Sequence, residues 1–320
     1  MQGFWKQLNK PVFVLAPMAD VTDAAFRRII AKYGKPDAMW TEFVSADGLA
    51  LAPEAGRKKL LKDLEYSESE RPIVAQFFTS SPENMRKAAE LASELGFDGV
   101  DINMGCPDRS IEKQGAGAAL MKNPKLAREI LRAAKEGAPN LAVSVKTRIG
   151  FNKPELEEWL PEILKESPAL ITIHARTRKE MSKVPAQWEF VKLAVDIRNA
   201  SGKETLIFGN GDVENLREAR KRVEETGCDG VMLGRAIFGN PWLFKEHEPL
   251  AEEKLEVLIE HCRLFEKLLV GGKNFAVMKK HFKAYIANFE GAGELRARLM
   301  ETNNASEVEI IIRNFLETLE

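Results

Sequence analysis

The chain has few cysteines, and they follow no pattern that would crosslink it or bind zinc. Its three cysteines, Cys106, Cys228 and Cys262, lie far apart among 320 residues. No CxxC pair is present, which argues against both a disulfide framework and a zinc site. We therefore expect a reducing, cytoplasmic compartment and no bound metal.

Long apolar runs and an excess of charge are also lacking. The first ten residues contain no stretch as long as the core of a signal peptide, and no run reaches the roughly 18 residues that span a membrane. We expect a soluble protein with no membrane contact and no stable protein partner. Lys+Arg number 47 against 48 Asp+Glu, a net charge of -1. Any nucleic acid must therefore be bound by a local basic face.

The remaining composition, 44% hydrophobic and 30% charged, is that of a globular protein. Apolar, β-branched runs predict eight strands: Val12–Ala16, Ala38–Phe43, Ile73–Phe77, Gly99–Asn103, Ala142–Thr147, Leu170–His174, Thr205–Gly209 and Gly230–Leu233. Helical periodicity between them predicts helices, among them Ala24–Tyr33, Glu83–Leu95, Lys125–Lys135, Leu156–Lys165, Trp188–Asn199 and Glu214–Glu225. This alternation predicts a parallel sheet, and eight strands predict an α/β fold of the (β/α)₈ TIM-barrel type.

The alternation ends near Pro249, and only helical patterns follow. They predict helices at Glu252–Leu269, Ala276–Phe289, Gly293–Met300 and Ser306–Leu319. We therefore expect a catalytic barrel over residues 1–248 and a separate C-terminal α-helical domain over residues 249–320.

Polar side chains stand at the predicted strand ends, where the loops of such a barrel build its functional face. Lys146 and His174 each close a buried apolar run, which packing does not explain. The last two loops, Gly209-Asn210-Gly211-Asp212 and Gly234-Arg235, are suited to an anion. Glycine lets backbone N–H groups approach a ligand, and arginine adds a charge-assisted donor. Isomerases, aldolases and flavoenzymes share such a phosphate site, so it selects no single chemistry.

A flavin is one ligand that the other strand ends suit. Gln76 offers a donor and an acceptor to the ring edge, and Lys146 offers a positive charge near N1 and O2. Met18, with the backbone around Pro17, is placed to pack against the ring. Cys106, between a glycine and a proline just after the fourth strand, is a candidate general acid because a thiol is mostly protonated at neutral pH.

These residues resemble the tRNA-dihydrouridine synthase family in their joint order. The segments that carry the resemblance are Ala16-Pro17-Met18-Ala19, Asp101-Ile102-Asn103-Met104-Gly105-Cys106-Pro107, Gly115-Ala116-Gly117-Ala118-Ala119-Leu120, Val145-Lys146-Thr147-Arg148, His174-Ala175-Arg176-Thr177-Arg178, Gly209-Asn210-Gly211-Asp212, Gly234-Arg235 and Asn240-Pro241-Trp242. In the tail, Lys280-His281 and Tyr285 are similar to a helical motif of the family. The loop from Glu180 to Pro185 departs from the family by lacking its tyrosine and glycine.

The resemblance implies an FMN-dependent oxidoreductase that reduces the uracil C5–C6 bond of specific tRNA uridines, with NADPH as reductant. Hydride would pass from FMN N5 to C6, and Cys106 would protonate C5. The implied FMN-binding residues are Ala16, Pro17, Met18, Gln76, Lys146, His174, Asn210, Gly211, Asp212, Gly234 and Arg235. The expected substrate-binding residues are Asn103, Arg148, Arg176, Lys279, Lys280 and His281.

The tail carries the local positive charge that binding tRNA requires. Between residues 263 and 298, eight Lys or Arg stand against three Glu, a local charge of +5. The uridine would have to leave its stack to reach a barrel mouth.

Two other interpretations of the function stay open on the residues alone. One is an FMN barrel acting on a free pyrimidine, as a dihydroorotate dehydrogenase-like enzyme would. The other is a phosphosugar lyase or isomerase, or a non-catalytic RNA-binding protein, on the same scaffold.

Overall fold

A computed structural model describes residues 3–269 and 271–318. The start of the segment tested for a signal peptide (residues 1–2) and the expected helix end at Leu319 therefore lie outside the described residues. Eight parallel strands form one sheet: β1 (Val12–Leu15), β2 (Met39–Ser45), β3 (Ile73–Phe78), β4 (Gly99–Met104), β5 (Ala142–Arg148), β6 (Leu170–His174), β7 (Leu206–Asn210) and β8 (Gly230–Leu233). All eight predicted strands are confirmed.

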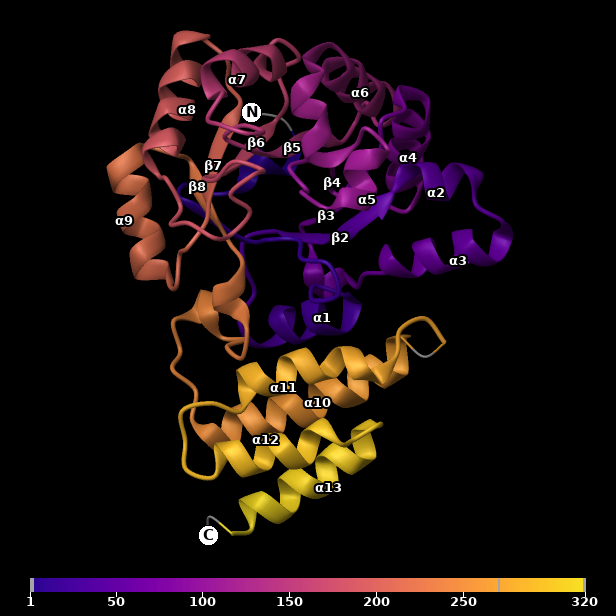
Figure 1. Ribbon diagram of the computed structural model, residues 1–320, viewed down its shortest axis with the longest axis vertical. Helices are drawn as coiled ribbons and strands as arrows, with labels where there is room; N and C mark the ends of the chain where they lie inside the picture. Colours follow the sequence, from indigo (N-terminus) through magenta and orange to yellow (C-terminus); the bar gives the residue numbers. More distant parts are fainter. Residues whose placement is uncertain (1–2, 270, 319–320) are drawn as a thin grey trace.

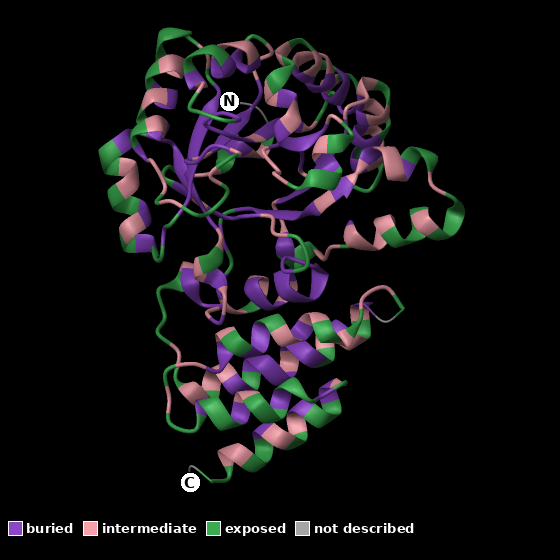
Figure 2. Cartoon of the chain, viewed as in Figure 1, coloured by how far each residue is buried: buried purple, intermediate pink, exposed green. Residues whose placement is uncertain are grey.

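The sheet curls into a barrel. Its strand order is β1-β8-β7-β6-β5-β4-β3-β2, and the two outer strands meet through a single parallel bridge between Val14 and Ala38. There the Leu15 N–H donates to the Ala38 carbonyl at 3.4 Å. Figure 2 shows the strands as an almost continuous buried layer, because side chains on one face fill the barrel and those on the other pack under helices.

Six helices cover the outside of the barrel. They are α1 (Ala24–Tyr33), α4 (Pro82–Glu94), α6 (Pro124–Gly137), α7 (Leu156–Leu164), α8 (Glu189–Ala200) and α9 (Leu216–Thr226). The side chains of Asp23, Ser81 and Asn123 accept backbone N–H groups in the first turns of α1, α4 and α6. These caps satisfy donors that a helix leaves free at its start. Each of the three helices begins within one residue of the start predicted from its periodicity.

The region after β2 contains two helices that periodicity does not reveal. α2 (Ala46–Leu51) is short, and α3 (Glu54–Asp63) has no buried residue. Without an apolar stripe facing a core, α3 carries no signal of helical period. Figure 1 shows α3 projecting from the side of the barrel. A further short helix, α5 (Arg109–Lys113), and the 3₁₀ turn η3 (Gly117–Lys122) follow β4.

The amino-terminal end of the barrel is closed by η1 (Gly3–Gln7), a 3₁₀ turn. Its Trp5 is 2% exposed and packs edge-on to Phe208, with ring centroids 5.6 Å apart, and beside Trp40 at 6.0 Å. This end is therefore filled by aromatic rings, and the open mouth lies at the carboxyl ends of the strands.

In the part of the tail that the structure describes, four helices lie below α1: α10 (Ala251–Leu269), α11 (Lys279–Tyr285), α12 (Ala292–Met300) and α13 (Ala305–Leu316) (Figure 1). They enclose an apolar cluster of their own, which Ala25 and Ile29 of α1 join. The helical character of the tail is confirmed. A boundary between two domains at residue 249 stays a prediction.

One predicted helix, Ala276–Phe289, is wrong in its extent. Residues Phe275–Met278 form the 3₁₀ turn η6, and α11 ends at Tyr285. Beyond it, Asn288 has φ +65° and Gly291 has φ +76°, which turns the chain. The Ile286 carbonyl accepts a hydrogen bond from Arg296 Nη1 at 2.8 Å instead of continuing the helix.

Candidate functional site at the barrel mouth

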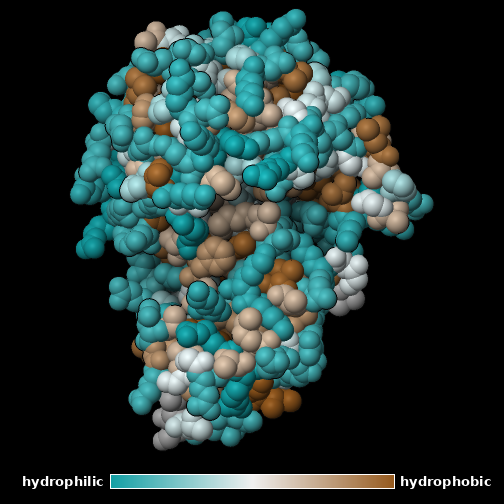
Figure 3. Space-filling model, viewed as in Figure 1, coloured by the Kyte–Doolittle hydropathy of each residue, from teal (hydrophilic) through white to brown (hydrophobic). Residues whose placement is uncertain are grey.

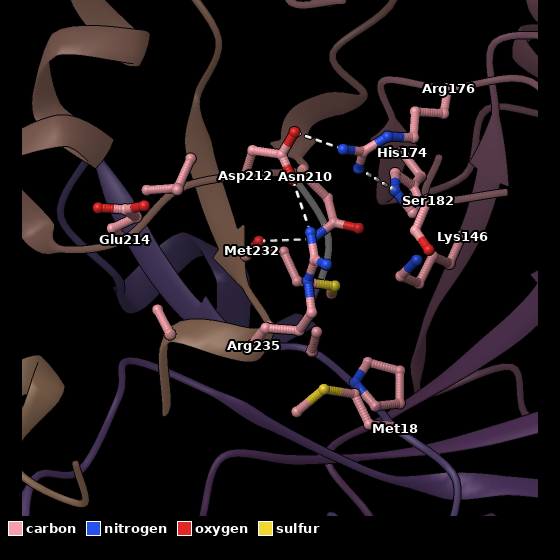
Figure 4. Close-up of a pocket in the computed structure, with 16 residues that line it drawn as sticks. Met18, Lys146, His174, Arg176, Ser182, Asn210, Asp212, Glu214, Met232 and Arg235 are labelled. Carbon is pink, nitrogen blue, oxygen red and sulfur yellow. Dashed lines mark hydrogen bonds and ion pairs between the residues drawn. The ribbon is translucent and has the colours of Figure 1, made fainter. Parts of the chain in front are cut away.

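A cavity of about 730 Å³ opens at the carboxyl ends of β1 and β5–β8 (Figure 4). Its walls are Ala16, Pro17, Met18, Lys146, His174, Arg176, Ser182, Asn210, Gly211, Asp212, Val213, Glu214, Met232, Gly234, Arg235 and Ala236. All the residues expected to bind the cofactor, apart from Gln76, thus lie around one cavity. Arg176, expected to bind substrate, is also on its wall.

One end of the cavity is built from the loops after β7 and β8. Gly211 has φ +133°, a conformation that a side chain rarely adopts, and a Cβ there would come within 2.8 Å of the Ala186 Cβ. Trp188 Nε1 donates to the Gly211 carbonyl at 2.9 Å and holds this turn in place. The turn therefore exposes backbone toward the cavity, as an anion site requires.

Asp212 organises two arginines at this end. Its Oδ1 accepts from Arg235 Nη2 at 2.7 Å, and its Oδ2 accepts from Arg176 and from the Ala186 N–H. The pKa of Asp212 is lowered, chiefly by the hydrogen bond from Arg176. The Arg235 side chain is 66% exposed, so Asp212 holds an accessible cation at the cavity, where an anion is able to share it.

Lys146 supplies a charge at the deep end of the cavity. Its Nζ makes no hydrogen bond or ion pair within the described residues, and Figure 4 shows it turned toward the open space. Burial, followed by repulsion from Arg148, lowers the pKa of Lys146 to about 8, whereas Asp101 and Cys106 oppose the shift. At neutral pH most Lys146 side chains are therefore protonated. An unpaired ammonium group in this position is suited to the anionic edge of a ligand.

His174 stands beside Lys146 as a neutral imidazole. Its pKa is lowered well below the ordinary value, first by burial and then by the surrounding cations. Its Nε2 lies 3.3 Å from Arg176 Nη1, and a guanidinium only donates. Nε2 is therefore the acceptor, and the proton sits on Nδ1, which is available as a hydrogen-bond donor.

The Cys106 loop borders the same mouth on the side of β3 and β4, outside the cavity wall. Asn103 Oδ1 accepts from the N–H groups of Gly105 at 3.1 Å and Cys106 at 2.9 Å, and the Cys106 carbonyl accepts from the Ala118 N–H at 3.0 Å. Gly117, with φ +59°, packs so closely that a Cβ would come within 2.9 Å of that carbonyl. The segment that begins at Gly115 thus makes room for the cysteine loop.

The Cys106 side chain is half-buried against an apolar cluster that contains Phe43 and Phe78. The two rings are 5.8 Å apart and nearly perpendicular. Burial is the main cause that raises the pKa of the Cys106 thiol. The thiol is therefore protonated at neutral pH and is suited to give a proton rather than to attack as a thiolate.

Gln76 and Asn103 lie inside the barrel, next to the cavity. Gln76 is 0% and Asn103 7% exposed, and Asn103 Nδ2 donates to Gln76 Oε1 at 3.0 Å. Gln76 Nε2 in turn donates to Asp101 Oδ2 at 2.5 Å. Sequence reasoning assigned no role to Asp101, although it opens the strand segment that ends in the cysteine loop.

Arg148, expected to bind substrate, is occupied by backbone carbonyls. Its Nε donates to Gly105 at 2.8 Å, and its Nη1 donates to Thr177 at 3.1 Å and Met181 at 2.9 Å. The residue is 7% exposed. In this structure Arg148 ties the cysteine loop to the loop after β6.

The three expected contacts in the tail divide by exposure. Lys279 is half-buried and Lys280 is exposed on α11, where Lys280 Nζ lies 3.5 Å from Asp20 Oδ2. His281 is 0% exposed and packs among the rings of Phe26, Phe238 and His261. The structure therefore brings Lys279 and Lys280 near the surface but gives His281 a packing position.

Sequence reasoning missed several residues around the mouth. Ser182, Met232 and Glu214 line the cavity, and Phe43 and Phe78 belong to the same apolar cluster as Cys106. Ser182 lies in the irregular loop after β6, for which no strand or helix signal exists.

Within the described residues, no three His, Cys, Asp or Glu side chains are grouped to hold a metal ion. No helix among those residues is both long and apolar enough to span a bilayer.

Known proteins match the chain over nearly its whole length. The sequence model of the family described as "Dihydrouridine synthase (Dus)" matches residues 14–320. The chain is 40% identical over 320 residues to a "Probable tRNA-dihydrouridine synthase 2" of Bacillus subtilis (strain 168), covering 98% of this chain and 97% of that protein. It is 38% identical over 318 residues to a "Probable tRNA-dihydrouridine synthase" of Staphylococcus aureus (strain COL), covering 98% and 96%.

A solved structure shares the fold at much lower identity. Histamine dehydrogenase from Rhizobium sp. 4-9 superposes with a TM-score of 0.56 at 14% sequence identity. The match covers 79% of this chain and 48% of that one, so the chain spans about half the length of that protein. At this identity the likeness shows the fold alone.

Proposed function

The chain belongs to the dihydrouridine synthase family, and on that premise we propose that it reduces specific uridines of tRNA to dihydrouridine, with FMN held in the mouth cavity and NADPH as reductant. The observation that carries the proposal is the position of a protonated thiol, Cys106, across the mouth from a cationic cavity that contains Lys146. We further propose that the enzyme acts in the cytoplasm.

The cavity fits FMN at its phosphate end. The Gly211 turn presents backbone where a Cβ would intrude, and Arg235 and Arg176 bring positive charge. Asp212 would serve by orienting these arginines, since a carboxylate does not bind phosphate itself. Gly234 also lines the cavity, and a Cβ there would make ordinary contacts with the Ala16 Cβ and the Met18 sulfur at 3.7 and 3.8 Å.

The other end of the cavity fits a flat ring system. Ala16, Pro17 and Met18 form an apolar part of the cavity wall, and Lys146 and His174 form a polar part of it (Figure 4). The first would pack against the face of the ring, and the second would lie at its polar edge. Lys146 would stabilise negative charge on that edge, and His174 would donate from Nδ1. When bound, FMN supplies the hydride that reduces C6 of the uracil ring.

Cys106 would complete the reduction of the uracil. Once C6 has been reduced, negative charge spreads over C5, C4 and O4, and a proton delivered to C5 removes it. The Cys106 thiol holds such a proton, because burial raises its pKa. Phe43, which packs with Cys106 against the cluster of Phe78, Ile111 and Ala116, would offer apolar surface to the pyrimidine.

The tail would hold the rest of the tRNA. Of the eight basic residues between 263 and 298, four have partners: Arg263 pairs with Glu309, Lys273 with Glu42, Lys280 with Asp20 and Arg296 with a backbone carbonyl. Figure 3 shows apolar surface gathered in the hollow between the barrel and the tail. A uridine that has left its stack would reach Cys106 through this hollow.

The decisive experiment joins a spectrum to a substrate test. The purified protein should be yellow and show a flavin absorption spectrum, and it should consume NADPH and form dihydrouridine with tRNA. Free uracil and orotate should give no turnover, which separates this activity from that of a free-pyrimidine reductase. The Cys106→Ala variant should keep its flavin and oxidise NADPH but lose most dihydrouridine formation. A colourless protein would contradict the cofactor, and undiminished product from Cys106→Ala would remove the thiol from the mechanism.

A further inference from the structure

A chain of hydrogen bonds runs from a buried carboxylate to the Cys106 loop. Ser144 Oγ donates to Asp101 Oδ1 at 2.5 Å, and Gln76 Nε2 donates to Asp101 Oδ2 at 2.5 Å. Gln76 Oε1 accepts from Asn103 Nδ2 at 3.0 Å. Asn103 Oδ1 then accepts from the Cys106 N–H at 2.9 Å and from its neighbour, Gly105.

The direction of this chain is fixed at both ends. Backbone N–H groups only donate, so Asn103 must turn its oxygen toward the Cys106 loop and its nitrogen toward Gln76. An ionised carboxylate only accepts, so Gln76 must turn its nitrogen toward Asp101 and its oxygen toward Asn103. Two amides that would otherwise be free to flip are thus aligned by Asp101 and the loop together.

Burying the carboxyl group of Asp101 has a desolvation cost, and packing does not require a carboxyl group at this position. It is 0% exposed, and no ion pair within the described residues touches its carboxyl group. Burial raises the pKa of Asp101 to about 6, although the hydrogen bonds from Ser144 and Gln76 oppose the shift. An apolar residue would fill the same space without a desolvation cost. The carboxyl group also lies off the cavity wall, so it is not placed to contact a ligand there.

The same carboxylate is near the cavity's deep cation. β4 and β5 pair Asp101 with Ser144 and Asn103 with Lys146, so Lys146 is one pleat further toward the mouth. The titratable groups that face Lys146 are Asp101, Arg148, Cys106 and His174. Asp101 is the one carboxylate in that group and supports the ammonium form of Lys146.

We propose that Asp101 is a positioning residue that acts through Gln76 and Asn103 to hold the Cys106 loop in place for proton transfer. The inference rests on the proposed function only in giving Cys106 the role of acid. The geometry of the chain stands without it. An unaligned Asn103 would present its NH₂ group to backbone N–H groups, which would release the loop.

The test measures how well the Cys106 thiol is held, in protein freed of flavin. Iodoacetamide labelling is followed at each cysteine by mass spectrometry. Asp101→Leu removes the acceptor from the chain, and we expect Cys106 to be alkylated about tenfold faster than in the unaltered protein, the effect of losing one buried hydrogen bond. Cys262, 0% exposed, should stay as slow as before. Its protection shows that the variant is folded.

Three variants separate the effect of breaking this chain of hydrogen bonds from a general loss of stability. Gln76→Met cuts the chain but leaves Asp101 in place, so it should also speed Cys106 alkylation, even if Asp101→Leu does not fold. Asp101→Asn still offers an oxygen to Gln76 and should restore slow alkylation. Ser144→Ala removes a partner of Asp101 outside the chain and should change the rate less than about threefold, because Gln76 and Asn103 keep their alignment.

A second readout follows the reaction. In Asp101→Leu loaded with FMN, kcat for dihydrouridine should fall about tenfold or more, and it should fall further than NADPH oxidation without tRNA, which reports the loss of support for the Lys146 ammonium alone. Cys106 alkylation within about twofold of the unaltered protein in both Asp101→Leu and Gln76→Met would overturn the proposal. Failure of the unaltered protein to make dihydrouridine would instead refute the proposed function. The labelling rates would still test whether the hydrogen bonds from Asp101 hold the Cys106 loop.

Discussion

One of the contacts between the tail and the barrel is a partly buried ion pair, and removing its cation should lower the free energy of unfolding. Lys273 Nζ lies 2.6 Å from Glu42 Oε2, with side chains 16% and 8% exposed. Burial opposes the charge of Lys273, yet Glu42, Asp23 and Asp63 outweigh it and raise the Lys273 pKa. In Lys273→Met these carboxyl groups would face one another without the ammonium group, and Arg27 alone would offset the charges of Asp23 and Asp63. Breaking a buried pair costs about 3–5 kcal/mol, and the residual exposure places this one at about 3 kcal/mol.

Thermal unfolding provides the assay. At about 2 °C per kcal/mol for a chain of this size, Lys273→Met should lower Tm by roughly 6 °C. The matched control is Lys192→Met, whose partner Asp196 is 3.9 Å away and where both side chains are 59% exposed. Such exposed pairs contribute about 0.5 kcal/mol, so its Tm should shift by about 1 °C. The double variant Glu42→Gln/Lys273→Met should recover part of the loss. The reasoning is refuted if Lys273→Met lowers Tm no more than the control does.

Three further predictions concern the mouth and the tail. The pKa of Lys146 is lowered to about 8, so a reaction step that needs its ammonium should be present below pH 8 and decline as pH rises through about 8. Lys146→Arg should keep the step active at higher pH, as measured by stopped-flow flavin reduction. If the variant loses rate over the same alkaline pH range as the unaltered protein, Lys146 is not the group that titrates. Charge reversal of Lys279 and Lys280 should weaken tRNA binding and flatten its salt dependence by about 0.7–0.9 log units for each phosphate that the tail no longer neutralises. Lys125→Glu, on a helix away from the tail and 81% exposed, is the control, and an equal weakening there would refute a local patch. Gly117→Ala, at φ +59° with a Cβ 2.9 Å from the Cys106 carbonyl, should destabilise the protein by more than about 1 kcal/mol and speed Cys106 alkylation. Unaltered denaturant unfolding would show that the loop gives way freely.

The strands and the mouth could be predicted from the sequence because both follow short-range rules. Each buried parallel strand is an apolar run, and a polar residue that closes such a run must face the mouth. Lys146 and His174 were found in this way and line the cavity. The same rule failed to show what Arg148 contacts. It lies two residues beyond Lys146, at the rim, where the carbonyls of three loop residues take its donors. Those loops have no period from which their positions could be predicted.

The tail shows a second limit of sequence reasoning. Clustered charge predicted a basic surface, but it does not say which neighbour of Lys279 and Lys280 turns inward. His281 does, because it packs against Phe26 of the barrel helix α1, a contact between residues 255 positions apart in sequence. α3 was missed for the opposite reason, since a helix without a buried face leaves no pattern to find.

The ion pair at Lys273 also links the tail to the cavity wall. Glu42, its partner, accepts the Asp20 N–H at 2.5 Å, and Asp20 belongs to the turn in which the Met18 carbonyl accepts the Thr22 N–H at 3.0 Å. Met18 is part of the apolar wall. A change in the tail that moves Lys273 therefore alters the charge balance at the end of that turn. If bound tRNA displaces the tail, FMN binding in the cavity should change as well. Lys273→Met should weaken FMN binding, although residue 273 lies outside the cavity wall.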